Sequence, residues 1–195
     1  MKYTTILILT LILTPKSYSQ LTKKYWLAGG YGSLYSYTDA FTNFGQPTVT
    51  GKLTEVNFAT NIGYFPTDKL ATGIRTSINS VKSRELNTAN SSTKDITFTI
   101  GPFVRYYFLQ TERQVNLLID GSYQLGTYST YAGKGISKTT TVSIGTEIFF
   151  NSAVGFELLI GYMSRSKSID DNLLGFTNKR TGLNLSVGFQ FHLTD

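Results

Sequence analysis

Apolar and polar residues alternate along most of the chain. In residues 96–108 (ITFTIGPFVRYYF), one side of an extended chain carries Ile96, Phe98, Ile100, Val104, Tyr106 and Phe108. The other side carries Thr97, Thr99, Gly101, Arg105 and Tyr107, with Phe103 as the exception. Because successive side chains of a strand point to opposite faces, this segment is predicted to be a strand with one apolar and one mostly polar face.

Similar segments recur along the chain, and no convincing helical period lies between them. The predicted strands are residues 25–37, 53–65, 70–82, 95–109, 115–128, 139–150, 154–165 and 181–193. Each is long enough to cross a bilayer, which takes roughly 9–11 tilted residues. Strands of globular domains more often have about 5–6 residues. The lengths therefore favour a transmembrane barrel.

The predicted connections alternate between long and short. The long connections are residues 38–52, 83–94, 129–138 and 166–180, and the short ones are 66–69, 110–114 and 151–153. Short turns at one rim and long loops at the other are typical of outer-membrane barrels, whose long loops lie outside the cell. Such a barrel would have both chain ends at the short-turn, periplasmic rim.

Ionisable residues in the middle of the strands indicate which face points outward. The polar faces carry Glu55, Arg75, Arg105, Asp120, Glu147 and Glu157. Facing lipid, each would cost on the order of a few kcal/mol near the midplane, whereas inside a barrel they can pair. We therefore predict a filled, salt-bridged lumen, since eight strands leave only enough interior for side chains. This set has two Arg against four acids, so Arg165, a neutralised acid or trapped water would complete it. A soluble barrel with a polar outer face is the alternative.

Two local features qualify this scheme. Pro102 lies inside a predicted strand, where the missing N–H implies a bulge or weakened pairing. Residues 70–82 alternate least clearly, with Thr72 and Thr76 on the apolar side.

We predict that tyrosines near strand ends form aromatic girdles at the membrane interfaces, with a carbohydrate-binding platform as the alternative. These are Tyr25, Tyr31, Tyr35, Tyr37, Tyr64, Tyr106, Tyr107, Tyr128 and Tyr131.

The start of the chain predicts export. Lys2 precedes an apolar run from Ile6 to Leu13, and small serines stand before Gln20. That run is too short to span a membrane, so residues 1–19 are predicted to be a signal peptide and residues 20–195 the barrel domain. The absence of Cys excludes disulfides and thiolate metal sites. The net charge of +6 is not gathered into a basic run that would suggest nucleic acid.

Several segments carry a family resemblance. YFPTDKLATG (64–73), GPFVRYYF (101–108) and NLLIDGSYQLG (116–126) resemble small outer-membrane β-barrel proteins of Bacteroidetes, often labelled porin family or outer membrane protein β-barrel domain. The resemblance covers about residues 20–195 and implies an eight-stranded, antiparallel, up-and-down barrel in a Gram-negative outer membrane.

The end of the chain, SVGFQFHL (186–193), resembles the assembly signal of such barrels. Ser186, Gly188, Phe191 and Leu193 fill the places of that signal, so the barrel-assembly machinery is an expected partner. The chain departs from the pattern by ending in Thr194–Asp195, since many such proteins end on an aromatic residue.

No catalytic, cofactor or metal site is predicted. The single His, His192, is expected on the lumen face beside the periplasmic rim, whereas a Ser–His–acid lipid hydrolase would place its His where lipid arrives. Asp170 and Asp171 are expected to be solvated turn residues, because a calcium site needs more oxygen ligands than this loop offers. The GKG at 133–135 has no strand-to-helix context, so it does not indicate a phosphate-binding loop.

These observations predict an integral outer-membrane protein that acts in envelope structure or in surface interaction through its long loops. The expected partners are outer-membrane lipid and lipopolysaccharide, and the ligand of the loops is left open. Basic residues in or near the loops would meet anionic groups: Lys82, Arg84, Lys94, Lys134, Lys138, Lys167, Lys179 and Arg180. A narrow porin-like channel for small solutes or ions is the alternative, and a lipid-modifying enzyme using His192 is the last alternative.

Overall fold

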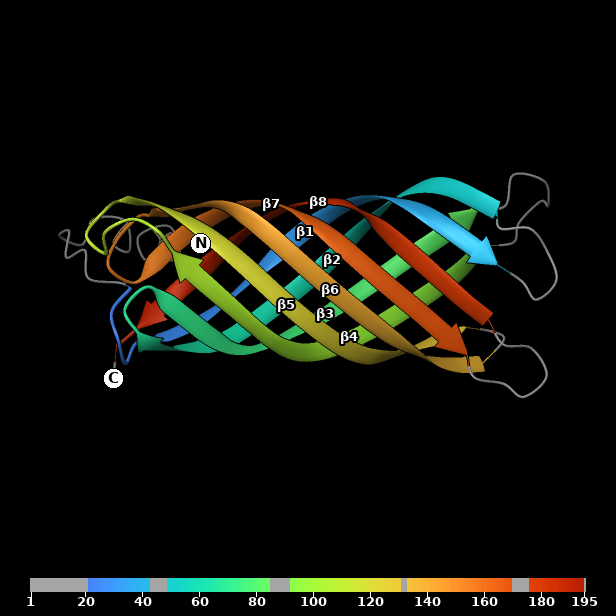
Figure 1. Cartoon of the computed structure of the whole chain (residues 1–195), viewed down its shortest axis with the longest axis horizontal. Helices are drawn as coiled ribbons and strands as arrows, with labels where there is room; N and C mark the ends of the chain where they lie inside the picture. Colours follow the sequence, from blue (N-terminus) through green and yellow to red (C-terminus); the bar gives the residue numbers. More distant parts are fainter. Residues whose placement is uncertain (1–20, 43–48, 85–91, 131–132, 170–175, 195) are drawn as a thin grey trace, which may run out of the picture.

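Eight antiparallel strands form a closed barrel in which each strand pairs with the next and the last pairs with the first (Figure 1). The computed structural model describes residues 21–42, 49–84, 92–130, 133–169 and 176–194. The strands are β1 (Trp26–Thr42), β2 (Val49–Thr67), β3 (Leu70–Arg84), β4 (Ser92–Tyr107), β5 (Val115–Thr130), β6 (Gly133–Phe149), β7 (Val154–Ile169) and β8 (Phe176–Leu193). The described part of the chain holds no helix of the length and apolarity needed to cross a membrane. The predicted fold class, an eight-stranded antiparallel barrel, is confirmed.

The position of the chain termini distinguishes the two ends of the barrel. Trp26 at the start of β1 pairs with Leu193 at the end of β8, and we call this end the terminal rim. The connections β2–β3, β4–β5 and β6–β7 also lie there, and the other four connections lie at the opposite rim. The strands run obliquely to the long axis (Figure 1), as barrel closure requires.

The strands are longer than predicted, mostly at the opposite rim. They contain between 15 and 19 residues. The predicted long loop at 129–138 is wrong, because Thr130 at the end of β5 pairs with Gly133 at the start of β6. The turn between β4 and β5, residues 108–114, is in fact the longer of the two. Ser, Thr, Gly and Lys suggest a loop by composition, but barrel pairing satisfies backbone groups whatever the side chain.

The outward apolar face covers only part of each strand. On β7 it extends from Val154 to Tyr162, and on β8 from Leu183 to Leu193. Both stretches match the roughly 9–11 residues that cross a bilayer. Beyond them, towards the opposite rim, the outward residues are Ser164, Ser166, Ser168, Thr177, Lys179 and Thr181. On β7 and β8 the barrel therefore has an apolar belt at the terminal-rim end and a polar extension above it. On β6, Ile136 is an exposed apolar residue at the height of this extension, since it pairs with Ser168.

Arg105 points into the lumen. Its exposure is 0%, whereas its neighbours Val104 and Tyr106 are 50% and 41% exposed on the outer surface. Exposed large apolar side chains occur on every strand, including Leu34, Phe58, Ile78, Phe98, Ile119, Ile144, Ile160 and Leu185. An apolar surface this continuous is not stable in water and matches the lipid-facing band of a membrane barrel.

Pro102 does not cause a bulge in β4. Ile100 pairs with Leu125 and Phe103 with Ser122, so the register is the same on both sides of the proline. The β4–β5 ladder lacks only the two pairs between them, which is a local weakening. Pro102 is on the exposed outer face. Phe103, the apolar exception on the polar side, is 2% exposed and lies on the lumen face, as its parity in the strand requires.

A hydrophobic cluster fills the lumen at the terminal rim. Its buried members are Leu21, Leu27, Phe65, Ala71, Phe103, Tyr107, Leu118, Phe149 and Leu159, and we call this set the apolar plug. The segment before β1 closes the base, because Lys69 donates its backbone N–H to the carbonyl of Leu21 (2.8 Å) and Lys24 donates to that of Phe65 (2.9 Å). Leu21 is thereby held at 0% exposure.

The prediction of tyrosine girdles is wrong for four residues. Tyr31, Tyr35, Tyr107 and Tyr128 are buried inside the barrel. Tyr106 is exposed on the outer surface, and the side chains of Tyr37 and Tyr131 lie outside the described residues. Nearness to a strand end did not distinguish these residues, because the face on which a side chain lies depends on its parity along the strand.

Candidate functional site

The six ionisable residues singled out in the sequence are all buried in the lumen, where they form two groups. Arg75, Arg105, Asp120, Glu147 and Glu157 form a central charge layer directly above the apolar plug. Glu55 belongs to a second group, nearer the opposite rim, together with Arg165 and Arg180.

Asp120 joins both arginines of the central charge layer. Arg75 donates from Nη1 to Oδ1 (2.7 Å) and from Nη2 to Oδ2 (2.9 Å), a bidentate pair. Arg105 donates from Nε to Oδ2 of the same carboxylate (3.0 Å). Strand register explains part of this arrangement, since Arg105 and Asp120 face each other on β4 and β5. Bidentate, charge-assisted bonds are among the strongest in proteins.

Glu147 and Glu157 complete the layer from the other side of the lumen. They are register partners on β6 and β7. Arg105 Nη1 lies 2.8 Å from Glu157 Oε2 and 3.9 Å from Glu147 Oε2, so one guanidinium is close to both carboxylates. The glycine at 155 leaves room for the Glu147 carboxylate, which a β-carbon at that position would contact.

His192 connects the central charge layer to the apolar plug. Its Nε2 lies 2.7 Å from Glu147 Oε1, and Tyr107 donates its hydroxyl to Glu147 Oε2 (2.6 Å). The imidazole ring lies 5.2 Å from the ring of Phe149 and 5.9 Å from that of Phe65. His192 is thus on the lumen face near the terminal rim, buried among side chains that exclude lipid.

Two aromatic rings hold Arg75 in place. Its guanidinium carbon is 5.1 Å from the centre of the Tyr31 ring and 4.7 Å from that of Phe103. These are cation–π distances, and such contacts are strongest where water is excluded. Neither ring was predicted as a member of the site, although both rings share their strand parity with polar lumen residues, which was a usable signal.

The second group lies among polar residues. Arg165 donates from Nη1 to Glu55 Oε1 (2.7 Å), and Arg180 donates from Nη1 to Oε2 (3.5 Å). Lys167 Nζ lies 4.9 Å from the centre of the Tyr128 ring. The expectation that Lys167 and Arg180 are loop residues available to outside partners is wrong. Longer strands place both side chains inside the lumen, where they are 3% and 8% exposed.

The other basic residues expected in the loops differ in what the structure shows. Lys138 and Lys179 are exposed on the outer face of β6 and β8. The side chains of Lys82, Arg84, Lys94 and Lys134 lie outside the described residues, as do Asp170 and Asp171. Among the side chains that the structure does describe, no group of three His, Cys, Asp or Glu is placed to hold a metal ion.

The two halves of the lumen differ in the side chains that fill them. Towards the opposite rim the inward residues are polar, and Asn79, Thr97 and Ser137 have buried polar atoms with no partner among the described residues. Arg75, Arg105 and Glu157 of the central charge layer each have such an atom as well. Buried polar groups are normally hydrogen-bonded, and a polar, roomy site satisfies them with water. We therefore expect water in the polar outer half, while the apolar plug closes the lumen at the terminal rim.

The residues of the predicted assembly signal divide between the two faces of β8. Ser186 is in the lumen with its hydroxyl 2.8 Å from that of Ser33. Gly188 also points inward, where a β-carbon would meet the backbone of Gly30. Phe191 and Leu193 are exposed on the outer belt. Their role in assembly stays a prediction.

Known proteins share the architecture but little sequence. No known protein family and no curated protein matches the chain. Among solved structures, the outer membrane protein OprG from Pseudomonas aeruginosa aligns with a TM-score of 0.57 and 11% identity over 91% of this chain and 99% of that one. Neisserial surface protein A gives 0.48 and 17% over 83% and 96%, and Ail of Yersinia pestis gives 0.33 and 10% over 85% and 99%. The chain thus has the fold of small eight-stranded outer-membrane barrels.

Proposed function

We propose that this protein is an integral outer-membrane barrel that does not conduct and that acts in envelope structure or surface interaction. In this proposal residues 1–19 direct export, the terminal rim faces the periplasm and the polar extension faces outward. The single observation that carries the proposal is the closed lumen. Arg75, Asp120 and Arg105 join β3, β5 and β4, and Arg105 reaches Glu157 on β7 across the lumen, with the apolar plug below.

The outer surface supports the membrane part of this proposal. The apolar belt has the height of a bilayer on β7 and β8, and the strands continue beyond it with polar residues on both faces. A barrel that only anchored itself would need no such extension. The fold shared with OprG, an outer membrane protein by its name, supports the choice of membrane.

The polar extension is the surface we assign to contact with other molecules. Lys138 and Lys179 are exposed on its outer face, and cations at this height favour anionic groups such as those of lipopolysaccharide. No catalytic role is part of the proposal, because His192 is buried against Glu147 and the apolar plug, away from the lipid-facing surface.

Planar-bilayer recording of the folded protein tests the closed lumen. We expect electrical silence from the native chain, because no water-filled path crosses the bonded layer. Insertion is checked on a gel, where the folded barrel should run faster than boiled protein. A steady conductance that changes in Arg105→Ala would overturn the proposal in favour of the narrow channel. Ions would then enter through the polar outer half of the lumen.

A further inference from the structure

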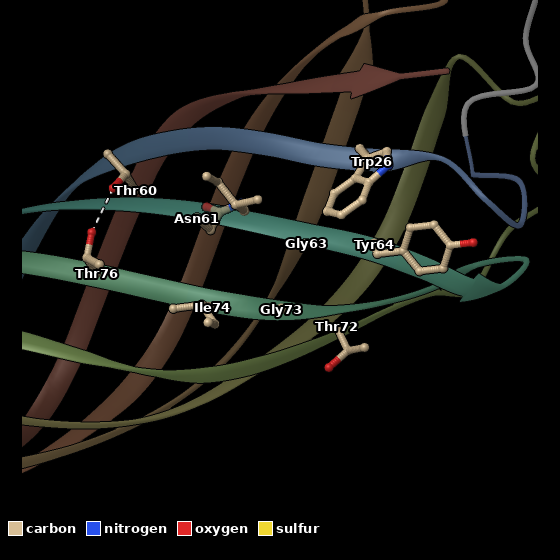
Figure 2. A pocket seen from close by; sticks show the side chains of 10 residues that line it. Trp26, Thr60, Asn61, Gly63, Tyr64, Thr72, Gly73, Ile74 and Thr76 are labelled. Atoms are coloured by element: carbon tan, nitrogen blue, oxygen red, sulfur yellow. Dashed lines mark hydrogen bonds between the residues drawn. The ribbon is translucent and has the colours of Figure 1, made fainter. Parts of the chain in front are cut away.

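A groove lies on the outer surface where β1, β2 and β3 meet near the terminal rim (Figure 2). Its volume is about 490 Å³, and its lining includes Trp26, Ile62, Tyr64, Thr72, Ile74 and Thr76. Figure 2 shows Trp26 and Tyr64 towards one end of it, with Thr60 and Thr76 farther along the strands. We call it the β2–β3 groove.

Short outward side chains create this hollow. Thr60, Thr72 and Thr76 occupy positions on the belt that elsewhere hold large residues such as Ile144 and Ile160. Beneath them, Gly63 and Gly73 are register partners. The unusual threonines of β3, which made its alternation the least clear, thus have a structural consequence: they leave space in a surface that is otherwise convex.

The lining of the groove is mostly apolar, although three threonines belong to it. The hydroxyls of Thr60 and Thr76 bond to each other (2.8 Å), and Thr72 donates to the carbonyl of Phe103 (3.2 Å). These bonds occupy the three hydroxyls, and Ile62 and Ile74, which are 64% and 58% exposed, line the same groove. The groove is continuous with the lipid-facing belt, so hydrocarbon is what meets it.

The length of the groove suits one acyl chain. From Tyr64 to Thr60 along β2, four residue steps at about 3.3 Å each give about 13 Å. One leaflet of a bilayer contributes about 15 Å of hydrocarbon. A chain lying in the groove would touch protein on several sides, whereas a chain on the convex belt touches it on one.

Aromatic and basic residues mark the end of the groove where a head group would lie. The rings of Trp26 and Tyr64 are 5.3 Å apart and inclined at 63°, and such aromatic residues are enriched at the membrane–water interface. Lys24 stands two residues before Trp26, and Lys69 is in the β2–β3 turn just before Leu70. The carboxylate of Asp68 in the same turn accepts the backbone N–H of Lys23 (2.7 Å).

We propose that the β2–β3 groove binds one acyl chain of an anionic glycerophospholipid, whose phosphate lies among Lys23, Lys24 and Lys69. Within the cell this would be a lipid of the periplasmic leaflet, and that assignment rests on the orientation proposed above. The charge of the rim and the apolar groove together match the two parts of such a lipid. Each lysine near a phosphate favours anionic over zwitterionic lipid by about fivefold.

The chain contains a direct reporter of occupancy, because Trp26 is its only tryptophan and lines the groove. The full barrel is folded into vesicles that contain either brominated phosphatidylglycerol or brominated phosphatidylcholine in an unlabelled phosphatidylcholine background. Bromine on the acyl chain quenches a touching indole. We expect quenching of Trp26 to rise at least about fivefold more steeply with the mole fraction of the anionic lipid, which is the effect of a single lysine.

Two variants separate the groove from its head-group end. Thr72→Leu with Thr76→Leu fills the groove and should reduce the quenching by both lipids at low mole fraction. Lys24→Asn with Lys69→Asn should remove only the preference for phosphatidylglycerol. Asn suits these two positions because both have positive φ, 77° and 66°, a conformation that Asn tolerates.

Matched controls lie elsewhere on the same barrel. Thr146→Leu makes the same type of change at one outward position of β6. Arg113→Asn removes one charge from the β4–β5 turn. Neither variant should change the quenching. Gel mobility verifies that each variant is folded. Equal quenching curves for the two lipids in the native protein, or curves unaffected by both double variants, would overturn the proposal. A closed lumen in bilayer recordings would be untouched by that result.

Discussion

The two halves of the lumen are built from the same strands but are filled in different ways. At the terminal rim, Arg75, Arg105 and Asp120 share bonds above a layer of apolar side chains, and Glu147 ties the two layers together through His192. Towards the opposite rim, Glu55 binds Arg165 among polar side chains such as Asn57 and Thr139.

This difference shows that strand alternation alone does not determine what a barrel interior does. The inward positions of β5, for example, hold Leu118 in the apolar plug, Asp120 in the charge layer and Gln124 among polar residues. The same strands thus line an apolar, closed section of the lumen near the terminal rim and a polar section towards the opposite rim. The depth to which water can enter the lumen depends on which side chains meet across it.

The largest expected difference between the two halves is their access to water. The chain has no Cys, so a single introduced thiol reports on one position. Ser137 and Ala71 are both 0% exposed, so the test separates polar from apolar surroundings. In folded protein, Ser137→Cys in the outer half should react faster with a small water-borne thiol reagent than Ala71→Cys in the apolar plug. Mass spectrometry of the intact protein gives both yields, and denatured samples confirm that both thiols can react. Equal labelling would remove the distinction between wet and dry halves.

Breaking the central charge layer should have the largest effect on stability. Asp120→Ala leaves Arg75 and Arg105 buried without their shared carboxylate, a loss that costs about 3–5 kcal/mol. Denaturant unfolding of the barrel in detergent, followed by gel mobility or tryptophan fluorescence, gives the change in unfolding free energy. The matched control is Glu112→Ala in the β4–β5 turn, where the side chain is exposed. A midpoint that moves no further for Asp120 than for Glu112 would contradict the assignment.

The corresponding change in the outer half should be smaller. Glu55→Gln removes one carboxylate from Arg165 and Arg180, but water can replace part of that bonding, so we expect a loss of about 1–2 kcal/mol. The same unfolding experiment measures it. If Glu55→Gln destabilised the barrel as much as Asp120→Ala, the outer half would be as dry as the inner half.

Much of the architecture was predictable from local pattern. The eight strands were each located by period-two alternation, and the inward orientation of Arg105 followed from the cost of a charge in lipid. Strand ends were predicted less well. At residues 133–138, Gly, Lys and Ser indicate a loop, yet pairing with β5 continues to Thr130, because neighbouring strands satisfy the backbone whatever the side chains are.

The candidate site was predicted in membership but not in arrangement. Arg105 and Asp120 are register neighbours, and their pairing follows from adjacent strands. Glu55 and Arg165 belong to β2 and β7, which do not pair with each other, and they meet across the lumen. No pattern within one strand carries that information, since it depends on how the closed sheet curves and staggers.

The sequence by itself determined which residues face lipid and which face the lumen, because parity along a strand is a local property. Only the tertiary structure decided that Phe103, Phe149 and Leu159 gather into a plug, that Glu55 separates from the other acids, and that the β2–β3 groove exists. Those features depend on closure, which brings together side chains from strands distant in the chain and sets how much space remains between them.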